Sequence, residues 1–260
     1  MTTWEVILLG FVQGATEFLP VSSSGHLVIA QAIMGIDVDG VLFEIAVHVA
    51  TLLSILVVYR NRIARLTRGV ISRDPDSLRY VGLLFVASIP AGLLGVFARE
   101  HILGLFESPI VPGVALLVTG AVLWSSRSVI EGAVLERPSW RGALLIGIAQ
   151  AFALIPGISR SGSTVVAALW LGVSAEEAAA FSFLMAVPAI GGAALVQVLA
   201  LGTQVEPGVG ALLIGAAVAA VTGVLAIRTF VAMLAKRSFH FFAPYCLAVG
   251  AAYLAFVWMG

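Results

Sequence analysis

Apolar residues run along most of this chain in long stretches with few charges between them. A helix needs about 20 apolar residues to cross the hydrocarbon core of a bilayer. Six stretches meet or approach that length, and we expect each to be a membrane-spanning helix: 41–59, 80–98, 111–126, 175–201, 209–235 and 241–259. The predicted fold class is therefore all-α, in a polytopic membrane protein.

Two further apolar regions, 4–36 and 140–172, are interrupted near their middle by proline, serine and glycine. Each region is long enough to enter the bilayer, turn and return, but each arm is short for a full crossing. Broken backbone at membrane depth is tolerated only where protein or water covers it. We therefore predict two re-entrant helical hairpins with buried tips.

The two interrupted regions are also copies of one another. Gly, Gln, Ser, Ser and Gly at positions 10, 13, 22, 24 and 25 recur 137 positions later, at 147, 150, 159, 161 and 162. Three predicted spanning helices separate the hairpins, and this odd number makes the second copy inverted. We expect one membrane domain, 1–260, with halves of about 1–126 and 127–260 whose hairpin tips meet near the bilayer midplane.

Composition supports the membrane prediction, and the basic residues add an orientation. The chain is 60% hydrophobic and 11% charged, against about 45–50% and 25% in soluble domains. Eleven of its fourteen basic residues lie in or beside three alternate connectors, 60–79, 127–141 and 236–237. By the positive-inside rule these connectors are cytoplasmic and both termini lie outside. The net charge is zero, so composition gives no argument for a nucleic-acid partner.

The second tip contains an arginine at the centre of an apolar region, Arg160. Such an arginine costs at least about 2.5–3.5 kcal/mol on membrane-insertion scales. A serine before a helical run caps the helix, and the free N–H groups there attract anions. With the guanidinium, this describes a phosphate or carboxylate site; the alternatives are snorkelling to an interface or pairing with a buried acid. The candidate binding residues beside it are Ser159, Ser161, Gly162, Ser163 and Thr164.

The first hairpin offers a carboxylate, hydroxyls and an imidazole. Gln13 and Glu17 are four residues apart and share a helix face. Glu17 is expected to hold a divalent cation with Gln13, to act as a base, or to pair with Arg160. Hard oxygen ligands of this kind suit Mg²⁺ or Ca²⁺. His26 is a candidate nucleophile, general acid or base, or a hydrogen-bonded core residue. The hydroxyl and glycine candidates between them are Ser22, Ser23, Ser24 and Gly25.

The charges at the two tips indicate the kind of ligand. One guanidinium and two helix N-termini, each equivalent to about +0.5 charge, face a single acid. A bound divalent cation would increase the positive surplus, which suits a multiply charged anion better than a carboxylate. Glu44 and His48, four residues apart in the first spanning helix, either line the same cavity or are structural.

The segments Gln13-Gly-Ala-Thr-Glu17-Phe-Leu-Pro-Val-Ser-Ser-Ser-Gly-His26 and Pro156-Gly-Ile-Ser-Arg160-Ser-Gly resemble the two signatures of the undecaprenyl-diphosphate phosphatases of the bacitracin-resistance type. The resemblance covers essentially the whole chain. It implies hydrolysis of a long-chain prenyl diphosphate, the lipid carrier of cell-wall synthesis, with a divalent cation. It also implies a bacterial plasma or inner membrane and a site that opens to the outer face. The family pattern allows Glu or Gln at position 13, so Glu17 is the one certain carboxylate of the pair.

Two questions stay open from the sequence. Inverted repeats with broken helices are also typical of secondary transporters, so a transporter or lipid flippase with a midplane anion site is the alternative function. The expected catalytic residues are Glu17, Ser23, His26 and Arg160, but the attacking group is either Ser23 assisted by His26, His26 itself, or an activated water. A serine hydroxyl needs a neighbouring base, which favours the first. A homodimer and a monomer are equally compatible with the sequence.

Overall fold

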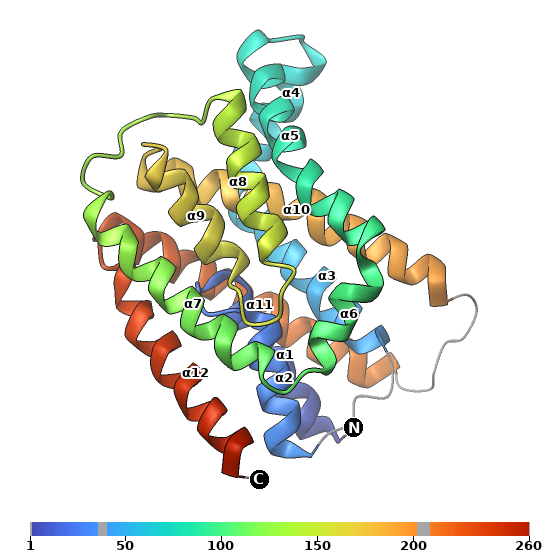
Figure 1. The fold of residues 1–260 in the computed structure, drawn as a ribbon. Helices are drawn as coiled ribbons and strands as arrows, with labels where there is room; N and C mark the ends of the chain where they lie inside the picture. The colour runs from blue at the N-terminus through green and yellow to red at the C-terminus, as the bar shows by residue number, and fades with distance from the viewer. Residues whose placement is uncertain (1, 36–40, 202–208, 260) are drawn as a thin grey trace.

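The structure, a computed structural model, describes residues 2–35, 41–201 and 209–259. Residue 36, the predicted end of the first hairpin, therefore lies outside the described residues. Within these ranges the chain folds into helices joined by short connectors, and no β-strand forms. The prediction of an all-α fold is confirmed (Figure 1).

All six predicted spanning helices are present, within about five residues of the expected bounds. They are α3 (Val41–Val58), α5 (Pro75–Phe97), α7 (Val111–Ser125), α10 (Ala175–Leu201), α11 (Val209–Ala235) and α12 (Phe242–Met259). Helices α5, α10, α11 and α12 are long and apolar enough to cross a bilayer alone. Helices α3 and α7 reach that length only together with a neighbouring helix that is sharply bent away from them.

These bent neighbours, α4 (Arg60–Ile71) and α6 (Arg99–Glu107), were not expected as helices. Helix α4 lies at 78° to α3, and α6 lies at 101° to α7. Residues 60–71 contain many arginines and no long apolar run, so the apolar pattern does not predict a helix there. The helix nevertheless packs Ile63 and Leu66 against the core, three residues apart and so on one face.

Both predicted hairpins form. The first consists of α1 (Thr3–Phe18) and α2 (Ser23–Met34), and the second of α8 (Trp140–Phe152) and α9 (Arg160–Trp170). They enter the molecule from opposite ends, the first from the end that holds both termini and the second from the end that holds the α4–α5 turn (Figure 1). The Ser161 hydroxyl donates to the Leu19 carbonyl at 3.2 Å, so the two tips meet inside the protein.

The repeated serines and glycines have local explanations in the two tips. Ser22 and Ser159 are the N-caps of α2 and α9. The hydroxyl of Ser22 accepts from the Gly25 N–H at 3.3 Å, and that of Ser159 accepts from the Gly162 N–H at 3.1 Å. Each cap satisfies an N–H group that would otherwise lack a partner at a buried helix start. The matching positions therefore build the same turn twice.

The repeated glycines at 10 and 147 serve helix packing. A Cβ atom on Gly10 would lie 2.6 Å from the Gly215 carbonyl oxygen, and one on Gly147 would lie 2.4 Å from the Ala87 carbonyl oxygen. Gly10 brings α1 against α11, and Gly147 brings α8 against α5. Small residues permit such close backbone approach in membrane proteins. The first arm of each hairpin thus packs on a helix of the opposite half of the chain.

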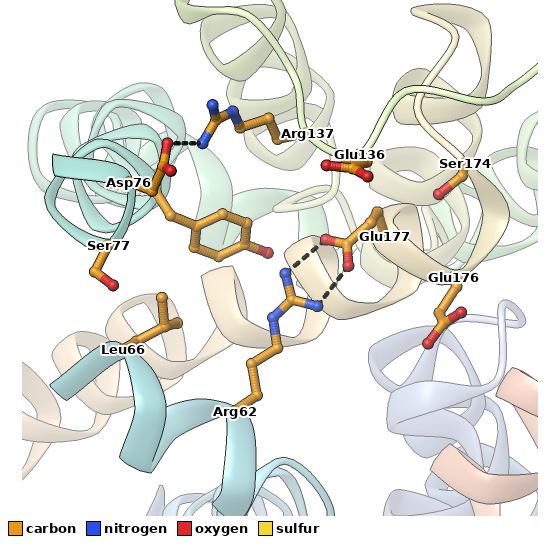
Figure 2. Close-up of a pocket in the computed structure, with 10 residues that line it drawn as sticks. Arg62, Leu66, Asp76, Ser77, Glu136, Arg137, Ser174, Glu176 and Glu177 are labelled. Atoms are coloured by element: carbon orange, nitrogen blue, oxygen red, sulfur yellow. Dashed lines mark hydrogen bonds and ion pairs between the residues drawn. The ribbon is translucent and has the colours of Figure 1, made fainter. Parts of the chain in front are cut away.

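Ion pairs hold together the end of the molecule that carries the basic connectors. The Arg62 guanidinium donates to both carboxylate oxygens of Glu177 and lies 4.9 Å from the centre of the Tyr80 ring. Arg137 pairs with Asp76 at 2.7 Å, and a hollow of about 460 Å³ opens between the two pairs (Figure 2). None of the predicted site residues lines this hollow, so it is separate from the site described below.

Candidate functional site

The two hairpin tips bring together the buried arginine and the buried carboxylate. Nη2 of Arg160 donates to Oε1 of Glu17 at 2.7 Å. The arginine side chain is 15% exposed and the glutamate side chain 7%, so Arg160 pairs with a buried acid rather than snorkelling to an interface. The other terminal nitrogen, Nη1, is buried without a hydrogen-bond partner among the described residues. A guanidinium N–H group thus remains for a ligand's oxygen.

The second oxygen of Glu17 collects the remaining polar groups of the first hairpin. Oε2 accepts from the Ser23 hydroxyl at 2.6 Å and from Nε2 of Gln13 at 3.0 Å. The contact from Gln13 confirms that the two side chains share a helix face. Nε2 of His48 lies 4.0 Å from the same oxygen, so α3 also borders the site. Glu17 is the group around which the site is built.

The residues around Glu17 fit a divalent cation that binds together with a phosphate ligand. The free oxygen of Gln13, Oε1, is buried and has no partner among the described residues. It and the Glu17 carboxylate are two hard oxygen ligands. No group of three His, Cys, Asp or Glu side chains in the described residues is placed to hold a metal. Mg²⁺ is usually bound by one or two carboxylates, with waters and substrate phosphates as its other ligands.

The predicted binding hydroxyls divide into two groups. Ser22 and Ser159 are 3% and 1% exposed, and their capping bonds use the hydroxyls to shape the tips. Ser161 and Thr164 are equally buried and bond to Leu19 and to Ser182. The less buried hydroxyls are those of Ser23, Ser24 and Ser163.

One glycine from each tip, Gly25 in the first and Gly157 in the second, allows the tips to touch. A Cβ on Gly25 would lie 3.0 Å from the Cα of Gly157, and Gly157 itself has φ of 100°, which L-residues rarely adopt. Gly162 lies inside the N-terminal turn of α9, where a Cβ would approach the Ser159 hydroxyl at 3.1 Å. Close contact of this kind leaves little room for any side chain between the tips.

His26 lies one helical turn after Ser23, but it does not face that serine's hydroxyl. Its Nδ1 lies 2.8 Å from the Ser22 carbonyl oxygen, and its Nε2 lies 2.8 Å from the hydroxyl of Tyr245 on α12. The Ser23 hydroxyl bonds instead to Glu17. The expected direct pairing of Ser23 with His26 is therefore absent from this arrangement, and Glu17 takes its place.

Sequence reasoning missed Tyr245 and left His48 undecided. Tyr245 lies 219 residues after His26, in an apolar run that also contains Tyr253, so nothing local distinguishes the two tyrosines. The only sequence signal at His48 is that Glu44 precedes it by one helical turn. In the structure, Nδ1 of His48 lies 2.7 Å from the backbone carbonyl oxygen of Glu44, and Nε2 points toward the Glu17 carboxylate.

The sequence is similar to those of known proteins along nearly its whole length. A family model described as bacitracin resistance protein BacA matches residues 6–252. An undecaprenyl-diphosphatase of Desulfatibacillum aliphaticivorans is 42% identical, over 96% of this chain and 97% of that protein. One of Alkaliphilus metalliredigens is 39% identical, over 98% and 99%, and undecaprenyl-diphosphatase 1 of Bacillus cereus is 36% identical, over 97% of each. These matches run through both hairpins and all six long helices, and the chain belongs to the BacA family of bacitracin resistance proteins.

Proposed function

We propose that this protein hydrolyses undecaprenyl diphosphate to undecaprenyl phosphate and inorganic phosphate. It is then a phosphoanhydride hydrolase that recycles the lipid carrier of cell-wall synthesis. The observation that carries the proposal is the meeting of Arg160, Glu17 and the Ser23 hydroxyl at buried hairpin tips. Relatives that match nearly the whole chain bear the name undecaprenyl-diphosphatase. A site within a membrane domain lets the prenyl tail remain in lipid while the diphosphate enters, from the outer face in this proposal.

In this proposal the tips bind the diphosphate through cationic and N–H groups. Cleavage of a phosphoanhydride depends mainly on positioning and on neutralising the charge of the phosphoryl oxygens. Nη1 of Arg160 is the donor available for one such oxygen. The N-termini of α2 and α9 add partial positive charge at the tips. Glu17 and Gln13 would hold a divalent cation, which supplies further charge neutralisation when bound.

The proposed nucleophile is the Ser23 hydroxyl. Its oxygen attacks the terminal phosphorus while its proton passes to Oε2 of Glu17, which already accepts its hydrogen bond at 2.6 Å. The bond from phosphorus to the bridging oxygen breaks, and undecaprenyl phosphate leaves. Water then attacks the phosphoserine, giving its proton to Nε2 of His26, and Ser23 recovers its proton from Glu17. Inorganic phosphate leaves, and His26 releases its proton to the solvent.

The function is tested by phosphate release from a long-chain prenyl diphosphate, using purified protein in detergent. No membrane gradient is present in this assay, so a transporter or flippase without hydrolase activity releases no phosphate. We expect release by the native protein, loss of release with a chelator, and recovery with Mg²⁺ or Ca²⁺. Arg160→Ala in folded protein should be severely impaired. Absence of release by the native protein with cation present contradicts the proposal.

Rapid quenching with substrate labelled in the terminal phosphate tests the nucleophile. We expect a labelled protein adduct that is stable in acid and missing in Ser23→Ala. An acid-labile, base-stable adduct would assign the attack to His26 instead. Turnover in Ser23→Ala at the native rate, with no adduct in either protein, would assign it to water.

A further inference from the structure

The contact between His26 and Tyr245 joins the first hairpin to the last helix of the chain. Nε2 of His26 lies 2.8 Å from the Tyr245 hydroxyl oxygen, and the two rings lie parallel within 8°, with centroids 5.7 Å apart. The tyrosine is 45% exposed, so this is a contact at the edge of the protein rather than in its core. Among the described residues, no charged side chain forms a hydrogen bond or an ion pair with either ring.

The second contact of the ring determines which nitrogen can react. Nδ1 of His26 lies 2.8 Å from the Ser22 carbonyl oxygen, which can only accept a hydrogen bond. Nδ1 therefore carries the hydrogen, and in the neutral ring Nε2 holds the lone pair. The Tyr245 hydroxyl must then donate to Nε2. The neutral imidazole is thus held in one tautomer, with its basic nitrogen against a hydroxyl group.

We infer that the Tyr245 hydroxyl orients His26 and passes the water's proton to it in the hydrolysis proposed above, on which this inference rests. A phenolic oxygen both donates and accepts. It donates to Nε2 when the imidazole is neutral. When water attacks, Nε2 takes the phenolic hydrogen while the phenolic oxygen takes the proton of the water, and that oxygen then accepts from the Nε2–H group. The same tyrosine therefore holds the ring in one orientation through both protonation states. Without it, only the Nδ1 bond restrains the ring, and Nε2 loses the hydroxyl through which it takes the proton.

Tyr245 is itself held firmly enough for this role. It lies in the first turn of α12, directly after Pro244, whose ring fixes the backbone φ angle where no N–H group is needed. The next residue, Cys246, is fully buried and donates to the Pro20 carbonyl in the first hairpin at 3.6 Å. Adjacent residues of α12 thus contact the α1–α2 tip twice, which ties the position of the tyrosine to that of His26.

Replacement of single tyrosines on α12 tests the inference. Tyr245→Phe keeps the ring but removes the hydroxyl, and we expect kcat to fall about tenfold and KM to fall with it, so that kcat/KM changes little. The loss should fall on kcat and not on kcat/KM, because His26 acts on the water that hydrolyses the phosphoserine, after undecaprenyl phosphate has left. Tyr253→Phe is the matched control, since it makes the same change about 12 Å further along the same helix. A kcat for Tyr245→Phe equal to that of the control overturns the inference.

Nitrogen NMR of ¹⁵N-histidine-labelled protein supplies a readout that does not need activity. The chain has four histidines, and the signals of His26 are assigned by their loss in His26→Gln. We expect the Nε2 signal of His26 to shift in Tyr245→Phe and to stay unchanged in Tyr253→Phe. An unshifted signal means that the hydroxyl does not bond to His26, and the inference fails. If the native protein is active but the kcat or the Nε2 signal does not change in Tyr245→Phe, only the role of Tyr245 is refuted. If the native protein is inactive, the proposed function is refuted.

Discussion

A double-mutant cycle on Glu17 and Arg160 separates a merely structural ion pair from a catalytic one. Removing one partner of a buried pair costs about 3–5 kcal/mol, because the other charge stays buried without compensation. Both side chains are largely buried here, at 7% and 15% exposure. Arg160→Gln leaves Glu17 with its bonds from Ser23 and Gln13, so we expect the lower end of the range, about 3 kcal/mol. Glu17→Gln should cost a similar amount.

The double variant, with glutamine at both positions, removes both charges at once. Its loss of stability should be smaller than the sum of the two single losses by about 2–3 kcal/mol, as for directly contacting residues. Its activity should not recover. Losing a donor that stabilises developing negative charge costs about 10²–10³ in kcat, and pairing the two amides does not replace that donor.

Stability is measured by SDS titration in mixed micelles, and activity by phosphate release in the same detergent. Arg237→Gln is the control for a generic loss of charge, because its pair with Glu131 at 3.1 Å is exposed. Such pairs contribute under about 1 kcal/mol. Recovery of turnover in the double variant would show that the pair is structural. Stability losses that simply add would show that the two residues are not coupled.

Three further predictions concern the packing of the fold, its orientation, and the end that carries the basic connectors. Gly147→Ala should destabilise the protein by about 1–3 kcal/mol through overpacking of α8 on α5, whereas Gly92→Ala on α5, which faces open space, should be neutral or slightly stabilising in the same unfolding assay. Single cysteines placed at Ser72 and at Ser108, in a protein whose native cysteine has been replaced, should react with an impermeant label from opposite sides of the membrane. Labelling of both positions from the same side contradicts the predicted arrangement of the helices. Arg62→Lys loses the two-pronged contact to α10, so its melting temperature should fall while KM stays unchanged, and an unaltered melting temperature would show that the pair contributes nothing.

The sequence by itself determined the six long helices, the two hairpins and their inversion. Apolar runs and their interruptions are local features, so they predicted α10 and α11 to the residue and placed the α8–α9 break at Pro156 and Gly157. The 137-residue repeat and an odd helix count then required opposite insertion. The sequence did not predict the arginine-rich helix α4. This helix is stabilised by two apolar side chains that pack on a core formed by other parts of the chain.

Only the tertiary structure decided which groups touch within the site. Ser23 and His26 are neighbours on α2, yet the serine hydroxyl turns to Glu17 and the imidazole to Tyr245. Sequence spacing specifies the helix face of a side chain, but the rotamer and its partner depend on what other helices bring near. The partners of these two residues come from α1 and α12, and the partner of Glu17 comes from α9. Long-range packing, rather than the local motif, therefore supplies Tyr245 to His26 and Arg160 to Glu17.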